Sequence, residues 1–428
     1  MTSPDPGALV ATTVRLVPAE VPALLSLLPQ DDPVSWVRRG EGLVGWGVAA
    51  VVRTSGPARF ADAAKWWAEL VARSTVRDEV DEPGTGMLAF GSFAFADGTA
   101  RTDRSDRSGD SVLVVPQVVV GRRGQHAWVT TIAPEAAGPQ DAPDLAPTDP
   151  PEAPAGVAFA DGAVDGESWM SVVADAVARI RAGALEKVVL ARDLVATATE
   201  PIDVRHTLRR LAATYPMCWT FHVDRLFGAT PELLVRRERG LVTSRVLAGT
   251  IRRTGDDEHD LALAAALARS SKDLEEHEYA VRSVADALEP HCSSMNVPES
   301  PFVLHLPNVM HLATDVAGVA RDETTSLELA AALHPSAAVG GTPTAAAVAL
   351  IAEIEGMDRG RYAGPVGWMD ASGDGEWGIA LRSGQLVGDG SAVRLFAGCG
   401  VVGSSDPASE LAESQAKLIP VRDSLGAD

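Results

Sequence analysis

Lysine is nearly absent from this chain of 428 residues, although 37 of its side chains are basic. Four of these are lysines, at positions 65, 187, 272 and 417, and the other 33 are arginines. A buried amine can give up its proton, whereas a guanidinium stays charged in a protein. The few lysines are therefore candidates for chemistry that arginine cannot perform, although chance survival at the surface explains any one of them as well.

Positive charge, cysteine and long apolar runs are also scarce. The 58 acidic groups leave a formal charge of −21, which argues against a protein that binds nucleic acid or an anionic membrane, because lysine and arginine provide such binding. Three cysteines cannot form a disulfide framework. The longest apolar run, residues 43–52, is too short to cross a bilayer, and residues 1–10 do not have the pattern of a signal peptide. We expect a cytoplasmic protein.

A proline-rich segment separates two parts of the chain. It contains seven prolines within residues 134–154 and is expected to be extended. Before it, an amphipathic pattern predicts a helix at residues 57–73. β-branched and aromatic residues, or alternation, predict five strands, at 12–16, 43–52, 87–95, 111–120 and 126–132. After it, helices and strands alternate, and they include helices at 272–288 and 407–422 and strands at 186–197 and 376–387. We predict an N-terminal lobe at residues 1–133, a linker at 134–163 and a larger second domain at 164–428.

Two of the predicted helices each carry a pair of acidic residues spaced three apart. Asp273 and Glu276 form one pair, and Glu410 and Glu413 form the other, with Lys417 one turn further along. Residues at this spacing share one face of a helix. If the two faces meet, their oxygens suit Mg²⁺, which prefers carboxylates and keeps positions open for water and ligand oxygens. For either pair alone, a solvated helix surface is the more common explanation.

Lys187 and Glu232 are candidates for proton transfer. Lys187 begins a strand that otherwise has the composition of a protein core, where burial drives an amine toward its neutral form, the form of a general base. Glu232 follows Thr230 and Pro231 at the entry to an apolar strand, where burial would raise the pKa of its carboxyl and make it a proton donor. The alternatives are a lysine that reaches solvent from a strand end and a glutamate with ordinary partners at a strand edge.

Arg382 and a glycine-rich segment are candidates for binding an anion. Arg382 shares a face of its predicted strand with Gly378 and Ala380, whose small size leaves room for a carboxylate beside the guanidinium. An intramolecular ion pair is an equal alternative. Residues 398–403 fit the dinucleotide pattern GxGxxG, but no helix follows directly and too little chain remains for a dinucleotide-binding unit. Glycine there instead allows backbone N–H groups to approach an anion closely.

In order and spacing, these motifs resemble the chorismate-utilising enzymes of menaquinone, siderophore and tryptophan biosynthesis, and among them most of all the isochorismate synthases. The resemblance covers about residues 164–425. The segments that carry it are LEKVVLAR (185–192), GATPELL (228–234), LAGT (247–250), SKDLEEHE (271–278), HLAT (311–314), GPVGW (364–368), GEW (375–377), LR (381–382), LFAGCG (395–400) and ELAESQAK (410–417).

This resemblance implies a reaction and its catalytic groups. Water adds at C2 of chorismate while the C4 hydroxyl leaves, which gives isochorismate. By analogy, Lys187 is the base that activates water, and Glu232 is the acid that protonates the departing hydroxyl. The implied cofactor is Mg²⁺, bound by Glu276 and Glu413 and supported by Asp273 and Glu410.

The resemblance also implies the substrate contacts and the architecture. Arg382, Tyr362 and the backbone of Gly398 would hold the enolpyruvyl carboxylate. The residues implied to line the ring pocket are Gly249, Thr250, His311 and Lys417. The expected fold is α+β and two-lobed, with antiparallel sheets packed face to face, helices outside, and residues 164–428 as the catalytic domain.

Comparison with other branches of the family favours water over nitrogen as the nucleophile. Anthranilate synthases that use ammonia lack the lysine that Lys187 represents, and aminodeoxychorismate synthases carry a nucleophilic lysine where this chain has Ala248. We therefore expect no glutaminase subunit, and a monomer is typical of this branch. Salicylate synthases keep the same base and also eliminate pyruvate, so that activity is an alternative, as is a chorismate-binding protein without catalysis. Thr342 stands where a larger apolar residue is expected, which bears on substrate position.

Overall fold

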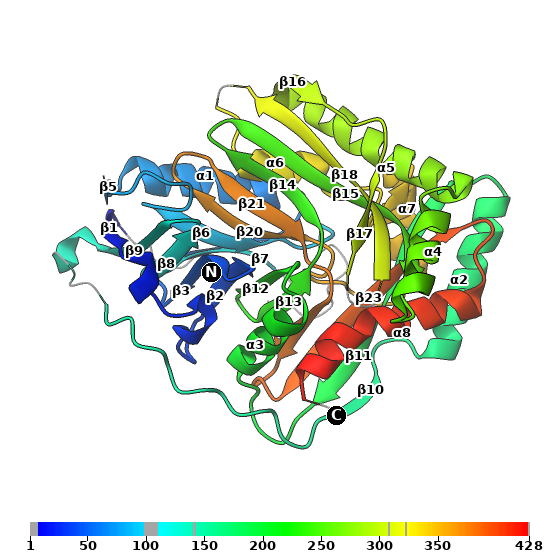
Figure 1. Ribbon diagram of the computed structural model, residues 1–428, viewed down its shortest axis with the longest axis horizontal. Helices are drawn as coiled ribbons and strands as arrows, with labels where there is room; N and C mark the ends of the chain where they lie inside the picture. Colours follow the sequence, from blue (N-terminus) through cyan, green and yellow to red (C-terminus); the bar gives the residue numbers. More distant parts are fainter. Residues whose placement is uncertain are drawn as a thin grey trace.

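The computed structural model of the chain describes residues 7–97, 110–138, 140, 143–306, 309–321 and 323–426, and all of their side chains except those of Lys272 and Glu276. Two large β-sheets face each other, with helices packed around them (Figure 1). This arrangement confirms the predicted α+β fold with antiparallel sheets packed face to face.

The first sheet runs through strands from both ends of the chain. Each strand pair described in it is antiparallel except β1 with β5. In spatial order its strands are β10 (Ala158–Asp161), β11 (Lys187–Thr197), β23 (Ala392–Val402), β22 (Ser383–Val387), β13 (Leu226–Thr230), β12 (Trp219–Val223), β2 (Val34–Arg38), β3 (Glu41–Trp46), β8 (Val118–Arg123), β9 (His126–Pro134), β1 (Leu9–Leu16) and β5 (Thr75–Asp78), with β19 (Gly341–Thr342) beside β11.

The second sheet is antiparallel throughout its described pairs, and its longest pair joins β15 with β18. In spatial order its strands are β16 (Cys292–Asn296), β18 (Val309–Ala320), β15 (Leu241–Arg252), β14 (Leu233–Glu238), β21 (Gly375–Ile379), β20 (Pro365–Asp370), β6 (Leu88–Ser92), β7 (Ser111–Val115) and β4 (Ala50–Thr54), with β17 (Phe302–His305) beside β18.

Apolar side chains fill the space between the two sheets. Trp36 and Trp219 of the first sheet lie in one buried cluster with Phe90 and Trp368 of the second sheet. Buried aromatic rings contribute much of the apolar area that stabilises a fold. The indole N–H groups of Trp36 and Trp219 both donate hydrogen bonds to Glu376 Oε2, at 2.7 and 3.1 Å. One buried carboxylate thus satisfies the polar atoms of two large side chains.

The helices pack on the sheets in two groups. The first sheet is covered by α2, α3 and α8, and the second sheet contacts α1, α5 and α6. Ser270 caps α5, and its Oγ accepts a hydrogen bond from the backbone N–H of Asp273 at 3.3 Å. The helices are α1 (Arg59–Ala72), α2 (Gly166–Arg181), α3 (Val204–Thr214), α4 (Asp257–Leu267), α5 (Ser271–Leu288), α6 (Ser326–Leu333), α7 (Thr344–Ile354) and α8 (Pro407–Ser424), with 3-10 turns η1 (Pro18–Glu20), η2 (Leu24–Ser26), η3 (Glu135–Ala137) and η4 (Glu289–His291).

Three strand predictions are wrong in the same way, because the chain crosses from one sheet to the other within each. Residues 43–52 contain the end of β3 and the start of β4. Residues 111–120 contain β7 and the start of β8, and residues 376–387 contain most of β21 and all of β22. In every case the first strand and the second belong to different sheets.

Each crossing has a local cause that ends regular strand pairing. At the first crossing, Gly47 has a φ of +68°, which a residue with a side chain adopts with strain. At the second, Pro116 has no backbone N–H to donate to a neighbouring strand. At the third, Arg382 itself has a φ of +48°. Residue alternation does not reveal these breaks, because both halves of each segment are apolar enough to be buried.

The proline-rich segment does not separate the strands into independent sheets. Residues before and after it pair in both sheets, as β2 does with β12 and β6 with β20. The predicted linker, residues 134–163, contains the last residue of β9, the turn η3 and the edge strand β10. The division into residues 1–133, 134–163 and 164–428 therefore stays a prediction. None of the described helices combines the length and the apolar composition that a bilayer crossing needs.

Candidate active site

One cavity of about 250 Å³ is lined by all but one of the site residues predicted from the sequence. They reach it from both sheets, from α5 and α8, and from the segments that connect the strands. They are Lys187, Glu232, Gly249, Thr250, Asp273, His311, Tyr362, Arg382, Gly398, Glu410, Glu413 and Lys417. Glu276 belongs to α5, but its side chain lies outside the described part of the structure, so its place in the site stays a prediction.

Lys187 is the first residue of β11 and is half-buried. Its backbone is held on both edges, opposite Val402 of β23 and opposite Thr342 of β19. Val189, which follows on the same face of the strand, lines the cavity as well. Lys187 is therefore placed at the cavity wall by two neighbouring strands, with Thr342 as its direct neighbour in β19.

Glu232 is buried in the connection between β13 and β14. Burial raises the pKa of its carboxyl to about 7, although Arg382, Lys187 and Lys417 act against this rise. Two hydrogen bonds fix its backbone. Glu232 N–H donates to Thr230 Oγ1 at 3.2 Å, and the Glu232 carbonyl accepts from Ile379 N–H of β21 at 3.2 Å. A carboxyl in this state can hold a proton near neutral pH.

Arg382 lies at the point where the chain crosses between the sheets, and not within a continuous strand as predicted. Its carbonyl accepts a hydrogen bond from Ala229 N–H at 3.1 Å. A Cβ atom on Gly228 would lie 2.6 Å from that carbonyl oxygen, so glycine is required for the close approach. Within the described residues no carboxylate forms an ion pair with Arg382, which favours the anion-binding interpretation over the intramolecular ion pair.

His311 presents an unsatisfied nitrogen in this cavity. Its Nδ1 shares a hydrogen bond of 2.9 Å with Thr250 Oγ1. Burial, together with the charges of Arg382 and Lys417, lowers the pKa of His311 to about 3, so the ring is neutral at physiological pH. Among the described residues its buried Nε2 has no hydrogen-bond partner. Buried polar atoms are normally satisfied, so this nitrogen is available to a polar group that enters the cavity.

Gly249 allows α5 to come close to β15. It has a φ of +76° and lies at an irregularity in the pairing of β15 with β18, between Ala248 and Thr250. A Cβ atom there would lie 3.3 Å from Asp273 Cβ. The glycine therefore gives the strand its bulge and makes room for Asp273 at the cavity.

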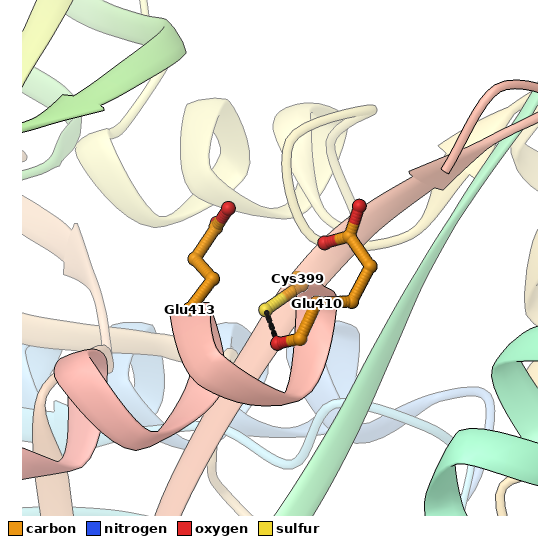
Figure 2. Close-up of side chains that lie close together, drawn as sticks. All are labelled: Cys399, Glu410 and Glu413. Atoms are coloured by element: carbon orange, nitrogen blue, oxygen red, sulfur yellow. Dashed lines mark hydrogen bonds between the residues drawn. The ribbon is translucent and has the colours of Figure 1, made fainter. Parts of the chain in front are cut away.

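Glu410 and Glu413 direct their carboxylates to the same side of α8, beside the Cys399 thiol (Figure 2). One ligand atom from each of the three lies within 4.8 Å of the others. Cys399 is not suited to be a ligand here, because burial raises the pKa of its thiol to about 12 and the thiol donates to the Glu410 carbonyl at 3.3 Å. With Asp273 at the same cavity, the remaining donors are carboxylate oxygens, and this donor set fits Mg²⁺.

Lys417 is bonded to two of the other site residues. Its Nζ donates to Glu413 Oε1 at 2.6 Å and to the Gly398 carbonyl at 2.9 Å. Burial alone would raise the pKa of Glu413, but the charges of Lys417 and Arg382 lower it below its usual value. Lys417 is therefore a charged group that already balances one carboxylate of the acidic cluster.

Tyr362 and Arg359 complete the wall next to β23. The buried ring of Tyr362 stacks on Phe396, with the ring centres 5.1 Å apart. Arg359 lines the cavity too and forms a buried ion pair with Glu355 at 2.6 Å. The sequence analysis missed this pair, because nothing local distinguishes one arginine among 33. The spacing of four residues between Glu355 and Arg359 is no signal either, because that rule holds within a helix and α7 ends at Ile354.

Comparison with known proteins places the chain in a family. Residues 8–426 match the family model described as "Chorismate binding enzyme". The isochorismate synthase MenF of Bacillus subtilis is 31% identical over 90% of this chain and 86% of its own length. The salicylate biosynthesis isochorismate synthase of Pseudomonas aeruginosa is 36% identical over 93% of this chain and 86% of its own length.

A solved structure agrees with these matches. The putative 2,3-dihydroxybenzoate-specific isochorismate synthase DhbC of Bacillus anthracis superimposes with a TM-score of 0.75 at 31% identity, covering 95% of this chain and 99% of the other. The protein therefore belongs to the family of chorismate-binding enzymes. This membership confirms the family that the sequence motifs indicate.

The raised pKa of Glu232 gives a prediction that does not depend on any reaction. In the metal-free protein we expect its carboxyl to keep its proton below pH 7 and to lose it above, because burial disfavours the carboxylate. Infrared difference spectra of wild type minus Glu232→Gln, recorded between pH 4 and 9, isolate this carboxyl band. Asp370→Asn is the control, since burial also raises the pKa of Asp370, to about 6. Loss of the Glu232 band already near pH 4.5 would contradict the assignment.

Proposed function

We propose that this protein is an isochorismate synthase, which adds water at C2 of chorismate and releases the C4 hydroxyl. The observation that carries the proposal is the convergence of Lys187, Glu232 and acidic residues from two helices on one cavity. The names of the relatives from Bacillus and Pseudomonas support the same activity. The reaction needs a base, an acid and cationic groups for two carboxylates, and the cavity contains candidates for each.

Lys187 is the proposed base, which takes a proton from the attacking water. An amine in its neutral form accepts a proton, whereas a guanidinium does not. A lysine at this wall of the cavity, in a chain that uses arginine at 33 other positions, fits that requirement. The strand neighbours of Lys187 fix its backbone, which limits the positions that the amine can take.

Glu232 is the proposed acid, which gives its proton to the departing hydroxide. With a pKa raised to about 7, the buried carboxyl is protonated in a large fraction of molecules at neutral pH and is still a strong enough acid to donate. One water enters and one water leaves, so the product is an isomer of the substrate. Lys187 gains one proton in each turnover and Glu232 loses one, and exchange with solvent restores both.

Arg382 and Lys417 are proposed to bind the carboxylates of the substrate. Chorismate is a dianion, and the formal charge of −21 repels it at long range, so attraction must come from charges inside the cavity. Arg382 has no carboxylate partner among the described residues, and its planar fork can hold a carboxylate through two hydrogen bonds. The neutral ring of His311 and the hydroxyl of Tyr362 add uncharged donors beside these cations.

Mg²⁺ is the proposed cofactor. Glu410, Glu413 and Asp273 would hold it, together with Glu276 by analogy with the family. When bound, a divalent cation supplies positive charge that neutralises and orients a substrate carboxylate. Lys417 contacts Glu413 directly, so it screens the charge of the acidic cluster that would hold the metal.

Product analysis tests the proposed function. We expect the purified protein with chorismate and Mg²⁺ to give isochorismate in chromatography, and to give none when a chelator removes the metal. Release of pyruvate with fluorescent salicylate would instead identify a salicylate synthase. Tight binding of chorismate without any product would identify a binding protein, and either result would contradict the proposal.

Replacement of Lys187 by alanine should abolish most turnover and spare binding. We expect kcat to fall by about 10²- to 10⁴-fold, because the base is lost while the carboxylate-binding groups remain. Chorismate affinity, measured by calorimetry, should stay close to that of wild type. Lys65→Ala is the matched control, since Lys65 lies on α1 with 77% of its side chain exposed. A Lys187→Ala protein with kcat near that of wild type would show that another group is the base.

The acidic cluster gives a prediction for metal dependence. Glu413→Gln should raise the Mg²⁺ concentration needed for half-maximal activity, because an amide is a weaker ligand for a hard cation than a carboxylate. Cys399→Ser should leave that concentration unchanged, because the protonated thiol is not expected to bind the metal. The measurement is turnover against free Mg²⁺ for wild type and both variants. Equal metal requirements for Glu413→Gln and wild type would remove Glu413 from the ligand set.

A further inference from the structure

The strand that carries Lys187 has an incomplete edge. Along one side, β11 pairs with β23 over its whole length, from Lys187 opposite Val402 to Thr197 opposite Ala392. Along the other side it pairs with β19 at residues 187–188 and with β10 at residues 194–197. Between these two pairings, no described strand lies beside residues 189–193, although Val189 N–H still donates to the Gly340 carbonyl at 2.9 Å and the Asp193 carbonyl accepts from Gly162 N–H at 3.1 Å. Val189, at one end of this stretch, lines the cavity.

Side chains take the place of the missing strand. The carbonyl of Val189 accepts a hydrogen bond from Arg359 at 2.6 Å. The N–H of Ala191 donates to Glu355 Oε2 at 2.7 Å, and the carbonyl of Ala191 accepts from Trp169 Nε1 at 3.0 Å. Backbone groups that are buried without partners are costly, and these side-chain bonds satisfy them where the neighbouring strands end.

Glu355 and Arg359 form a rigid unit at this edge. Their ion pair uses both oxygens of the carboxylate, with distances of 2.7 Å from Arg359 Nε and 2.6 Å from Nη2, and the two side chains are 1% and 3% exposed. The guanidinium also donates to the Val339 carbonyl at 3.0 Å and lies 4.2 Å from the ring centre of Phe95. A buried ion pair contributes little net stability compared with apolar residues of the same size. An apolar pair could not make the hydrogen bonds that Glu355 and Arg359 form with the backbone of β11.

The same unit is also bonded to the segment of Tyr362. Arg359 lines the cavity, and its carbonyl accepts a hydrogen bond from the N–H of Tyr362 at 3.0 Å. Val189, which Arg359 holds by its carbonyl, lines the cavity two residues from Lys187. Arg359 therefore connects the strand of the proposed base with the segment of a proposed substrate contact.

We propose that Glu355 and Arg359 are positioning residues: they complete the open edge of β11 and thereby fix Lys187 relative to the substrate ring. The inference rests on the proposed function, because Lys187 matters as the base of that reaction. Neither residue needs to touch the substrate for this role. A displacement of about 1 Å at a reacting group can lower a rate by about 10²-fold.

Arg359→Lys tests the role directly. Lysine keeps a positive charge near Glu355, but it lacks the planar fork that reaches Glu355, Val339 and Val189 together. We expect kcat to fall by about 10- to 100-fold with KM for chorismate close to that of wild type, since the fault lies in the position of the base. Hydrogen exchange followed by mass spectrometry should show faster exchange in peptides that cover residues 186–192. This second measurement does not depend on turnover.

Two further variants control for misfolding and for a general effect of arginine loss. Arg237→Lys is the matched control, because Arg237 pairs with Asp374 at side-chain exposures of 15% and 5%, and neither residue lines the cavity. The double variant Glu355→Gln with Arg359→Met leaves no buried charge unpaired and keeps an acceptor for Ala191 N–H. It should fold and show the same loss of kcat and the same faster exchange.

Three results would overturn the inference. They are unchanged kcat and exchange in Arg359→Lys, a rise of KM at constant kcat, or an equal loss in Arg237→Lys. The proposed function fails separately, when the wild-type protein makes no isochorismate. In that case exchange at residues 186–192 alone decides: faster exchange in Arg359→Lys supports the completion of the strand edge, and wild-type exchange refutes it.

Discussion

The charges around the cavity depend on one another, because Glu232 and His311 are buried and the charged groups beside them are at least partly withdrawn from water. Glu232 is driven toward its neutral form by burial, and the cations nearby limit that effect, so its pKa settles at about 7. His311 is kept neutral by burial and by the charges of Arg382 and Lys417. Glu413 stays ionised because Lys417 is bonded to it. An acid, an uncharged donor and an ion pair can therefore coexist within one small cavity, and a change in any of these charges alters the protonation of the others.

The two-sheet architecture brings these groups together from distant parts of the chain. The connection at Arg382 shows how, since the chain leaves the second sheet there and enters the first. Its backbone has a positive φ and is held by Ala229 N–H, beside a glycine that leaves space for the contact. Arg382 therefore follows a strand of one sheet and precedes a strand of the other, and it lines the cavity between the two sheets. Strain at this position is consistent with a constraint set by the site, because non-glycine residues adopt this conformation at a cost.

The sequence predicts the chemistry of this site better than its construction from strands. Lys187 and Glu232 are recognisable from the family motifs LEKVVLAR and GATPELL, since a charged residue at the start of an apolar strand also has ordinary structural explanations, and the acidic pairs are recognisable from helix periodicity. The crossings at Gly47, Pro116 and Arg382 are not, because the strands before and after each crossing have similar apolar composition and the partner strands are far away in the sequence. The same reason conceals the role of Arg359, whose four hydrogen-bond acceptors come from three separate segments of the chain.

The scarcity of lysine draws attention to the few positions that have one. The contacts of Lys65 and Lys417 then show that these two lysines differ in role. Lys65 is exposed on α1 and has no part in the site. Lys417 bonds to Glu413 and to the Gly398 carbonyl, so its ammonium acts as a fixed charge, with two of its three donors occupied. Among the described residues no contact is found for the third donor, which is the one that could serve the proposed anion. An arginine could also supply charge there, but its broad planar fork could not make these two contacts at a compact point and keep one donor free. A lysine at position 417 therefore fits a compact site with two acceptors, and the role proposed for Lys187 as a base is one that an arginine could not take.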